Sequence, residues 1–261
     1  MNFRVAIPSI SRAYAIGDKT LNYLSKTDID LTKVDVFLSK GEELEEYKKV
    51  LKDYPVNFYV SHTRHVNTQR NFIVNHYKEG QHVFGIDDDI DDMRYKIDDK
   101  RTERLTNLVE FVEQAFVLCE NYNIDLWGIN PVLNPYFMKN KISFDLKYIV
   151  ACCYGWINRH SPKAYVSTNP EYGKEDFERS IRYYIEDGAV MRFNNVSVKT
   201  KYYEGSGGIN DYRTYDYEET AVKWLLETFP YYCVRNNSKK SAKYPEVRLK
   251  DRLKRAKIAK G

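Results

Sequence analysis

The sequence predicts an α/β protein with a mostly parallel central sheet flanked by helices, in a single domain that ends in a basic tail. In the first half, short apolar stretches alternate with segments of helical periodicity, which is typical of βαβ units. One apolar stretch, Val83–Ile86, ends in three consecutive carboxylates. Beyond Tyr232 the hydrophobic pattern gives way to lysine and arginine.

Each predicted strand is a short apolar or β-branched run, and each predicted helix carries apolar residues three and four positions apart. The first half is expected to hold strands at Phe3–Ile7, Val34–Leu38, Val56–Val60, Val83–Ile86 and Asp125–Ile129, and helices at Asp18–Ser25, Glu42–Leu51, Asn67–Tyr77 and Glu103–Asn121. The second half is expected to hold strands at Tyr148–Ile157, Ala189–Phe193 and Val196–Tyr203, helices at Asp176–Tyr184 and Asp216–Thr228, and a glycine-rich loop at Tyr203–Gly208.

Composition excludes several classes of protein. No stretch reaches the roughly 20 apolar residues of a membrane span, and the amino end lacks the pattern of a signal peptide. The four cysteines show no CxxC spacing, so they are expected to be reduced thiols in a cytoplasmic protein. The absence of GxxxxGK[ST] and GxGxxG motifs disfavours a kinase, a P-loop ATPase and a Rossmann dehydrogenase.

Charge is distributed unevenly along the chain. Residues 235–261 contain eleven Lys or Arg and two acidic residues, about +9, whereas the whole chain carries +4. We therefore expect a domain at 1–234, followed by a basic tail at 235–261. The tail either contacts nucleic acid or keeps the protein soluble; from Val247 its charges recur at helical spacing.

The acidic run after Val83–Ile86 is the strongest chemical signal. Ligands bind outside the carboxyl ends of strands in open α/β sheets. Asp87 and Asp89 alternate along an extended backbone, so they are expected to point the same way and to hold Mg²⁺ or Mn²⁺. The alternative to a metal site is that this run forms a solvated acidic turn.

Two further segments are candidates for nucleotide contacts. The loop after the first strand contains Pro8, Ser9 and Arg12, and the arginine fork suits a diphosphate. Arg70 and Asn71 open the helix before the acidic strand, near the same sheet edge. Arg12 could equally be a surface arginine after a turn.

The order of these motifs, over roughly residues 2–130, resembles the nucleotide-sugar half of GT-A glycosyltransferases. The resemblance implies a GT-A-like sheet, with a nucleotide-sugar-binding half at 1–130 and an acceptor half at 131–234. The resemblance implies that Asp87 and Asp89 form the DxD motif, whose metal bridges the donor diphosphate, and that Asp88 contacts the donor. It also implies a general base at Asp176 or Glu175, although acids favour the first turn of any helix. Gly207 and Gly208 would close over the donor. The late histidine of many GT-A metal sites has no counterpart, because no histidine follows His160.

The complete arrangement, IPSISR, TQRNF, GIDDDI, WGINP, GKEDFE and YYEGSGG, is similar to the TET/JBP-associated glycosyltransferases of bacteriophages. This resemblance implies double-stranded DNA with a modified cytosine, 5-hydroxymethylcytosine, as the acceptor. Aromatic and polar residues of the second half would contact it, unless they fill the core: Trp127, Asn130, Tyr154, Trp156 and Tyr203. The tail residues Lys250, Arg252, Lys254 and Arg255 would contact DNA phosphates.

The sequence thus predicts a metal-dependent glycosyltransferase that transfers a sugar from a UDP-sugar to the hydroxyl of the modified base, in the cytoplasm of a phage-infected bacterial cell. Three alternatives stay open. A GT-A enzyme could act on an acceptor other than DNA, a metal-dependent nucleotidyltransferase would use similar carboxylates, and a non-catalytic DNA-binding protein would use the tail alone.

Overall fold

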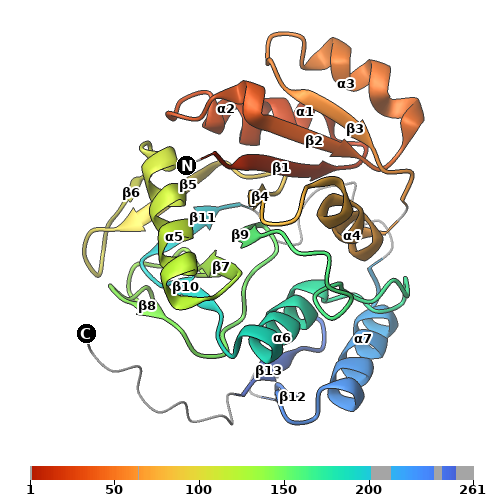
Figure 1. The fold of residues 1–261 in the computed structure, drawn as a ribbon, viewed down its shortest axis with the longest axis vertical. Coiled ribbons are helices and arrows are strands. Elements are labelled where there is room, and N and C mark those ends of the chain that lie inside the picture. Colours follow the sequence, from red (N-terminus) through yellow and green to blue (C-terminus); the bar gives the residue numbers. More distant parts are fainter. Residues whose placement is uncertain (1, 64, 201–212, 238–242, 251–261) are drawn as a thin grey trace.

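An eight-stranded mixed sheet runs through the centre of the protein, in the order β3-β2-β1-β4-β9-β7-β10-β8 (Figure 1). The computed structural model describes residues 2–63, 65–200, 213–237 and 243–250. The strands of this sheet are β1 (Arg4–Ser9), β2 (Val34–Leu38), β3 (Asn57–Val60), β4 (His82–Ile86), β7 (Leu126–Ile129), β8 (Ile142–Ser143), β9 (Cys153–Ile157) and β10 (Met191–Phe193).

Two smaller sheets and seven α-helices complete the described part. The small strands are β5 (Asp92–Lys96), β6 (Thr102–Arg104), β11 (Val196–Lys199), β12 (Cys233–Arg235) and β13 (Val247–Leu249). The helices are α1 (Ala13–Ile16), α2 (Asn22–Leu24), α3 (Leu44–Val50), α4 (Val66–His76), α5 (Leu108–Tyr122), α6 (Glu175–Asp187) and α7 (Tyr215–Thr228). A π-helical turn, Gly17–Leu21, joins α1 to α2, and 3-10 turns occupy Leu31–Lys33 and Gly41–Glu43.

The mostly parallel sheet that the sequence predicts is confirmed, and two of its strands are antiparallel to their neighbours. Strands β3, β2, β1 and β4 pair in parallel, as do β7 and β10. Strand β9 runs antiparallel between β4 and β7, and β8 pairs antiparallel with β10. Since β9 is antiparallel to both neighbours, β4 and β7 point the same way. The start of β9 therefore lies at the edge where β1, β4 and β7 end.

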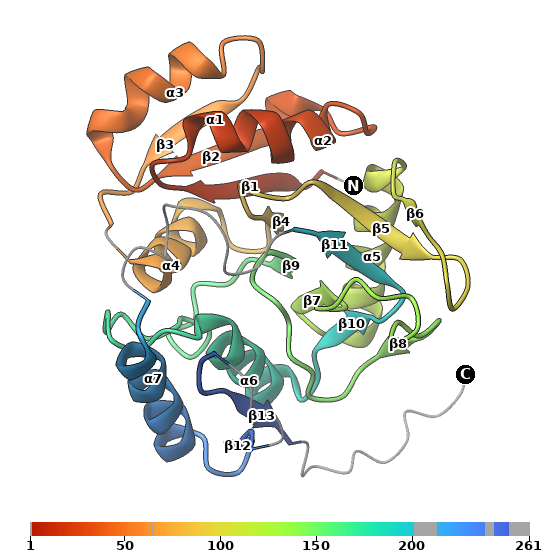
Figure 2. The ribbon, with the colours of Figure 1, turned by 180° about the vertical axis from the view of Figure 1, so that it is seen from behind.

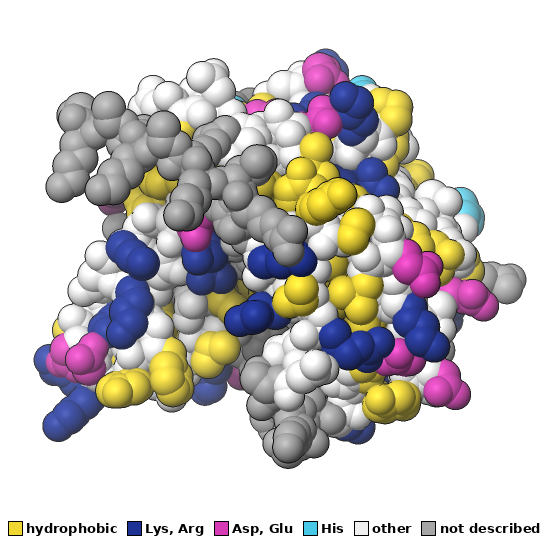
Figure 3. All heavy atoms as spheres, turned by 90° about the horizontal axis from the view of Figure 1, so that it is seen from below, with side chains coloured by type: hydrophobic (Ala, Val, Ile, Leu, Met, Phe, Trp, Pro, Cys, Tyr) yellow, Lys and Arg dark blue, Asp and Glu magenta, His cyan; other side chains and the backbone are white. Residues whose placement is uncertain are grey.

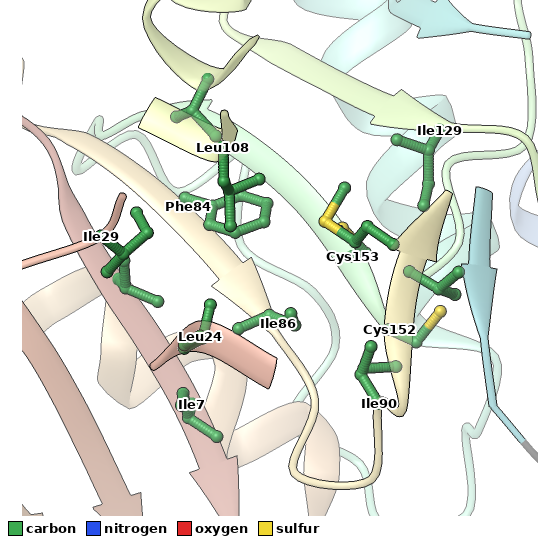
Figure 4. Close-up of a cluster of buried hydrophobic side chains, with 14 of the residues drawn as sticks. Ile7, Leu24, Ile29, Phe84, Ile86, Ile90, Leu108, Ile129, Cys152 and Cys153 are labelled. Atoms are coloured by element: carbon green, nitrogen blue, oxygen red, sulfur yellow. The ribbon is translucent and has the colours of Figure 1, made fainter. Parts of the chain in front are cut away.

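Side chains that alternate along the strands build two apolar layers, one on each face of the sheet. On one face, Phe84 and Ile86 pack with α2 and α5, and Figure 4 shows them beside Ile90, Cys152 and Cys153. On the other face, alternate residues of the same strands pack against α4, α6 and α7. Figures 1 and 2 show the sheet between these groups of helices. The two layers hold the strand ends, and thus the acidic run, in fixed positions.

Three sequence predictions differ from the structure. The helix predicted at Glu103–Asn121 begins only at Leu108, because Thr102–Arg104 pairs with β5 as strand β6. The strand predicted at Tyr148–Ile157 begins at Cys153, and the residues before it form a loop. The helical spacing from Val247 is wrong for Val247–Leu249, which pairs with β12 as a strand, and Val247 is buried.

None of the helices in the described residues is both long and apolar enough to cross a membrane.

Candidate active site

The carboxyl ends of β1 and β4 and the segment before β9 meet at one edge of the sheet. Asp87, the first residue after β4, donates its backbone N–H to the carbonyl of Cys152, with an N···O distance of 2.9 Å. Its own carbonyl accepts the hydroxyl of Thr20 at 2.7 Å, and the same hydroxyl accepts the N–H of Ile90 at 3.0 Å. The acidic turn is therefore fixed at both ends by hydrogen bonds from other elements.

Asp88 points inward, toward the end of β1. Its carboxylate accepts hydrogen bonds from Ser9 at 2.6 Å and from Arg12 at 3.0 Å. Burial raises the pKa of Asp88 to about 6, and Arg12 and Ser9 oppose that shift. Tyr47 of α3 completes the group, since its hydroxyl lies 2.8 Å from the Ser9 hydroxyl and accepts the N–H of Arg12 at 2.9 Å.

Asp87 and Asp89 flank Asp88 and stay partly open to solvent, although residues 88 and 89 form a turn and do not continue the extended strand. The side chain of Asp87 is 29% exposed and that of Asp89 is 25% exposed, whereas that of Asp88 is 6% exposed. Asp89 lies 3.4 Å from Arg12 and accepts the Thr200 hydroxyl at 3.3 Å. Burial, followed by the Asp87 carboxylate, raises the pKa of Asp89.

This pair of carboxylates fits a hard divalent cation. Both side chains present oxygen donors to solvent, and after burial it is the charge of Asp87 that raises the pKa of Asp89, a repulsion that a cation would relieve. No group of three or more His, Cys, Asp or Glu side chains in the described residues is arranged to hold a metal ion. A cation here would therefore take two protein ligands and fill its other positions with water or substrate phosphate oxygens, which is the usual manner of Mg²⁺.

Arg70 of α4 connects the acidic turn to the start of α6. Its Nη2 donates to Asp87 at 2.7 Å and to the carbonyl of Ala151 at 3.3 Å, and its Nε lies 3.8 Å from Glu175. On the far side of Glu175, Nη2 of Arg179 also lies 3.8 Å from the carboxylate. Burial disfavours the charge of Arg70, but Asp87, Tyr154 and Glu175 outweigh it and raise its pKa.

The two acidic residues at the start of α6 have different surroundings. Glu175 is buried; burial and the neighbouring Asp176 raise its pKa, while Arg179 and Arg70 oppose the shift. Asp176 is half-buried, and it accepts the hydroxyl of Tyr148 at 2.5 Å and the N–H of Phe177 at 2.9 Å. Each oxygen of Asp176 thus has one donor and keeps a lone pair for a further partner.

Three aromatic residues that were predicted to contact the acceptor are buried in the core. Trp127 is fully buried between aromatic rings of the core, so it is a core residue and offers no surface to an acceptor. Trp156 is also buried, with its indole N–H donated to Asn158. The ring of Tyr154 is covered by Trp156 and by Arg179, whose guanidinium carbon lies 4.0 Å from the ring centroid.

Three further predicted residues also serve the fold. Asn130 is buried and donates its amide to the carbonyl of Val132, which fixes the chain after β7. Asn71 exchanges two hydrogen bonds with the backbone of Val166, so it anchors a loop rather than facing a nucleotide. Pro8 is a buried residue inside β1, because the strand extends to Ser9.

Some predicted residues lie outside the described residues: Tyr203, Gly207, Gly208, Arg252, Lys254 and Arg255. Lys250 is described, and its backbone N–H bonds to the carbonyl of Tyr232 at 2.8 Å. Sequence reasoning missed Tyr47, Tyr148, Arg179 and Thr200. Tyr47, Tyr148 and Thr200 acquire their partners from distant segments of the chain, so no motif marks them. Arg179 follows Glu175 by four residues on α6, a spacing that could have indicated the pair.

Comparison with solved structures finds proteins of similar fold. The chain is similar to S. aureus TarS 1-349, with a TM-score of 0.54, 15% sequence identity and coverage of 88% of this chain and 72% of that one. It is similar to the same protein in complex with UDP-GlcNAc, with a TM-score of 0.59, 15% identity and coverage of 87% and 67%. For a further TarS structure the TM-score is 0.53, and this chain covers 40% of it. No protein-family model and no curated protein sequence matches the chain. The central sheet and its flanking helices therefore form a fold that resembles that of the GT-A glycosyltransferases.

Proposed function

We propose that this protein is a metal-dependent glycosyltransferase that takes a sugar from a nucleoside diphosphate sugar. One observation carries the proposal. On a GT-A-like fold, two solvent-accessible carboxylates lie at the end of β4, and one of them, Asp87, is linked through Arg70 to Glu175 of a second acidic pair at the start of α6. A metal site and a general base are the two groups that this transfer needs at neighbouring positions.

The donor half of the site lies at the ends of β1 and β4. Asp87 and Asp89 would hold Mn²⁺ or Mg²⁺, which would neutralise charge on the departing diphosphate. Arg12 lies beside Asp88 and Asp89, so its guanidinium can reach phosphate oxygens next to them. A uridine nucleotide is the donor we favour, because one of the similar TarS structures contains UDP-GlcNAc.

Asp176 is the general base of the proposal. It would take the proton from the acceptor hydroxyl as that oxygen attacks the anomeric carbon of the donor sugar. Asp176 is more exposed than Glu175, and its two hydrogen bonds hold the carboxylate in one orientation. Glu175 lies between two arginines, which suits it to orient the start of α6.

The acceptor is a finer part of the proposal. A 5-hydroxymethylcytosine base in double-stranded DNA is the acceptor that the sequence predicts. The face seen in Figure 3 carries Lys and Arg side chains among hydrophobic ones and some Asp and Glu, and its Lys and Arg side chains would contact a polyanion. The similarity to TarS favours the broader function, a glycosyltransferase whose acceptor is open to test.

The test is incubation with Mn²⁺ and a panel of UDP-sugars, with and without DNA that contains 5-hydroxymethylcytosine. Release of UDP and the mass of the nucleosides are measured. We expect UDP release from at least one donor, and loss of that release in Asp87→Asn and Asp89→Asn. Asp98→Asn, which removes an exposed carboxylate from the β5–β6 turn, is the matched control.

Each outcome distinguishes one alternative. A sugar mass on the base establishes the DNA acceptor, whereas UDP release without such a mass retains the glycosyltransferase and rejects DNA. If no donor is consumed and nucleoside triphosphates yield pyrophosphate instead, the protein is a nucleotidyltransferase. If neither substrate is consumed and DNA is bound, the proposal of an enzyme is wrong.

A further inference from the structure

Arg70 is a counterion that two carboxylates share. Its guanidinium, 6% exposed, donates to Asp87 at 2.7 Å, so in this structure it is committed to the acidic turn. Its Nε faces Glu175 at 3.8 Å, which is beyond hydrogen-bond distance. The guanidinium of Arg70 thus balances the charge of two carboxylates, Asp87 in the candidate metal site and Glu175 in the candidate base site.

The arginine donors that face Glu175 lack hydrogen-bond partners. Within the described residues, Nε of Arg70 and Nη2 of Arg179 are buried donors with no hydrogen-bond partner. Both face the same Oε1 of Glu175 at 3.8 Å. Buried polar groups without partners are unfavourable, so a shift of less than an ångström toward Glu175 would be stabilising if Arg70 were released from Asp87.

We propose that Arg70 couples the two halves of the site, occupying Asp87 until a divalent cation neutralises that carboxylate and then pairing with Glu175 at the start of α6. The inference rests on the proposed function, because it assumes that Asp87 is a metal ligand. Arg70 is then a positioning residue. It links donor binding to the orientation of the base helix, so that the base is set only after the donor is bound.

The coupling predicts opposite effects of two substitutions on Mn²⁺ affinity. Arg70→Gln removes a positive charge next to Asp87, so Mn²⁺ should bind tighter, by about tenfold or more. Glu175→Gln removes the competing partner of Arg70, so Mn²⁺ should bind several-fold weaker. A purely structural role would make both variants bind Mn²⁺ more weakly, because each would loosen the site.

The experiment measures Mn²⁺ dissociation constants by calorimetry, without donor or acceptor, for the wild type and the two variants. Arg182→Gln is the matched control, since it breaks another buried α6 ion pair, with Glu178 at 2.6 Å, that does not involve Asp87 or Arg70. Unchanged affinity in the control and opposite shifts in the two variants support the coupling. Equal or weaker Mn²⁺ binding by Arg70→Gln overturns it, while a wild type that binds no Mn²⁺ overturns the metal role as well.

A measurement on the wild type covers the case in which the variants fail to fold. Amide hydrogen exchange is followed for peptides that span residues 174–181, with and without Mn²⁺ and UDP. Closure of Arg70 onto Glu175 should slow exchange in the first turns of α6, whereas peptides from α5 should be unaffected. Bound Mn²⁺ and UDP with no change in α6 would overturn the inference.

Discussion

Replacing Asp176 by Asn separates the two acidic residues at the start of α6. The change removes the proton acceptor but keeps an oxygen that can accept a hydrogen bond from Tyr148 or Phe177. A positioned general base contributes about 10²- to 10⁴-fold to a rate, which corresponds to about 3 to 5 kcal/mol in the activation barrier. Because Asp176 is half-buried and the replacement has the same shape, the free energy of unfolding should fall by only about 1 kcal/mol.

Replacing Glu175 by Gln should lower the stability more than the activity. Glu175 is buried between Arg70 and Arg179, and losing one partner of a buried ion pair costs about 3 to 5 kcal/mol of stability. Since Glu175 does not take the proton, the variant that remains folded should lose less activity than Asp176→Asn. The two substitutions therefore act on different quantities, one on the rate and the other on the free energy of unfolding.

The assay combines UDP release, with the donor and acceptor found in the panel, and urea denaturation of the same preparations. Asp216→Asn is the matched control, since Asp216 is an exposed acid in the first turn of α7 and its loss costs about 0.3 to 1 kcal/mol through the helix dipole. The reasoning fails if Asp176→Asn keeps more than a tenth of the wild-type activity, or if it destabilises the fold as strongly as Glu175→Gln.

Three further predictions concern stability and are checked by urea denaturation. Gly155→Ala should destabilise the fold by about 1 to 3 kcal/mol, because the new Cβ would lie 2.2 Å from Nε1 of the fully buried Trp127; an unchanged midpoint would contradict this packing. Asn71→Ala should cost at least about 2 kcal/mol, since it leaves the N–H and carbonyl of Val166 without partners, and a loss near zero would show that water replaces them. Burial raises the pKa of Asp88 to about 6, so the folded state binds a proton at this carboxyl more tightly than the unfolded chain does. The stability that the protonated Asp88 contributes is full below about pH 4 and is lost as the pH rises through about 6. The free energy of unfolding of the wild type should therefore fall by up to about 3 kcal/mol relative to Asp88→Asn over that interval, and parallel pH profiles would refute the shift.

Local pattern was sufficient for the strands of the first half. Apolar runs of strand length predicted β1, β2, β4 and β7 because a strand buried on both faces needs continuous apolar residues. The strands depend on neighbours in sequence, which is why the sequence alone determined them. The period of two along an extended chain also predicted that Asp87 and Asp89 share an orientation, and this stays a prediction, because residues 88 and 89 form a turn and the two carboxylates contact different arginines.

Burial of single side chains could not be predicted in the same way. Trp127 and Trp156 are aromatic residues of strands, and in sequence such residues are equally typical of a ligand contact and of the core. What decided between the two was the packing of α5 over one face of the sheet and of α6 over the other. The strand at Val247–Leu249 was hidden for a similar reason, since its charged sequence forms a strand by pairing with β12.

The sequence by itself determined which chemistry is present: acids at the end of a buried strand, an arginine at the start of the preceding helix and an acidic pair opening another helix. Only the tertiary structure decided how these groups combine. Arg70 lies between Asp87 and Glu175, and Tyr148 orients Asp176, across separations of 17 to 105 residues that no local periodicity can register. Contacts of that kind depend on the order of strands in the sheet, because β9 places the loop before it beside the end of β4 and beneath the start of α6.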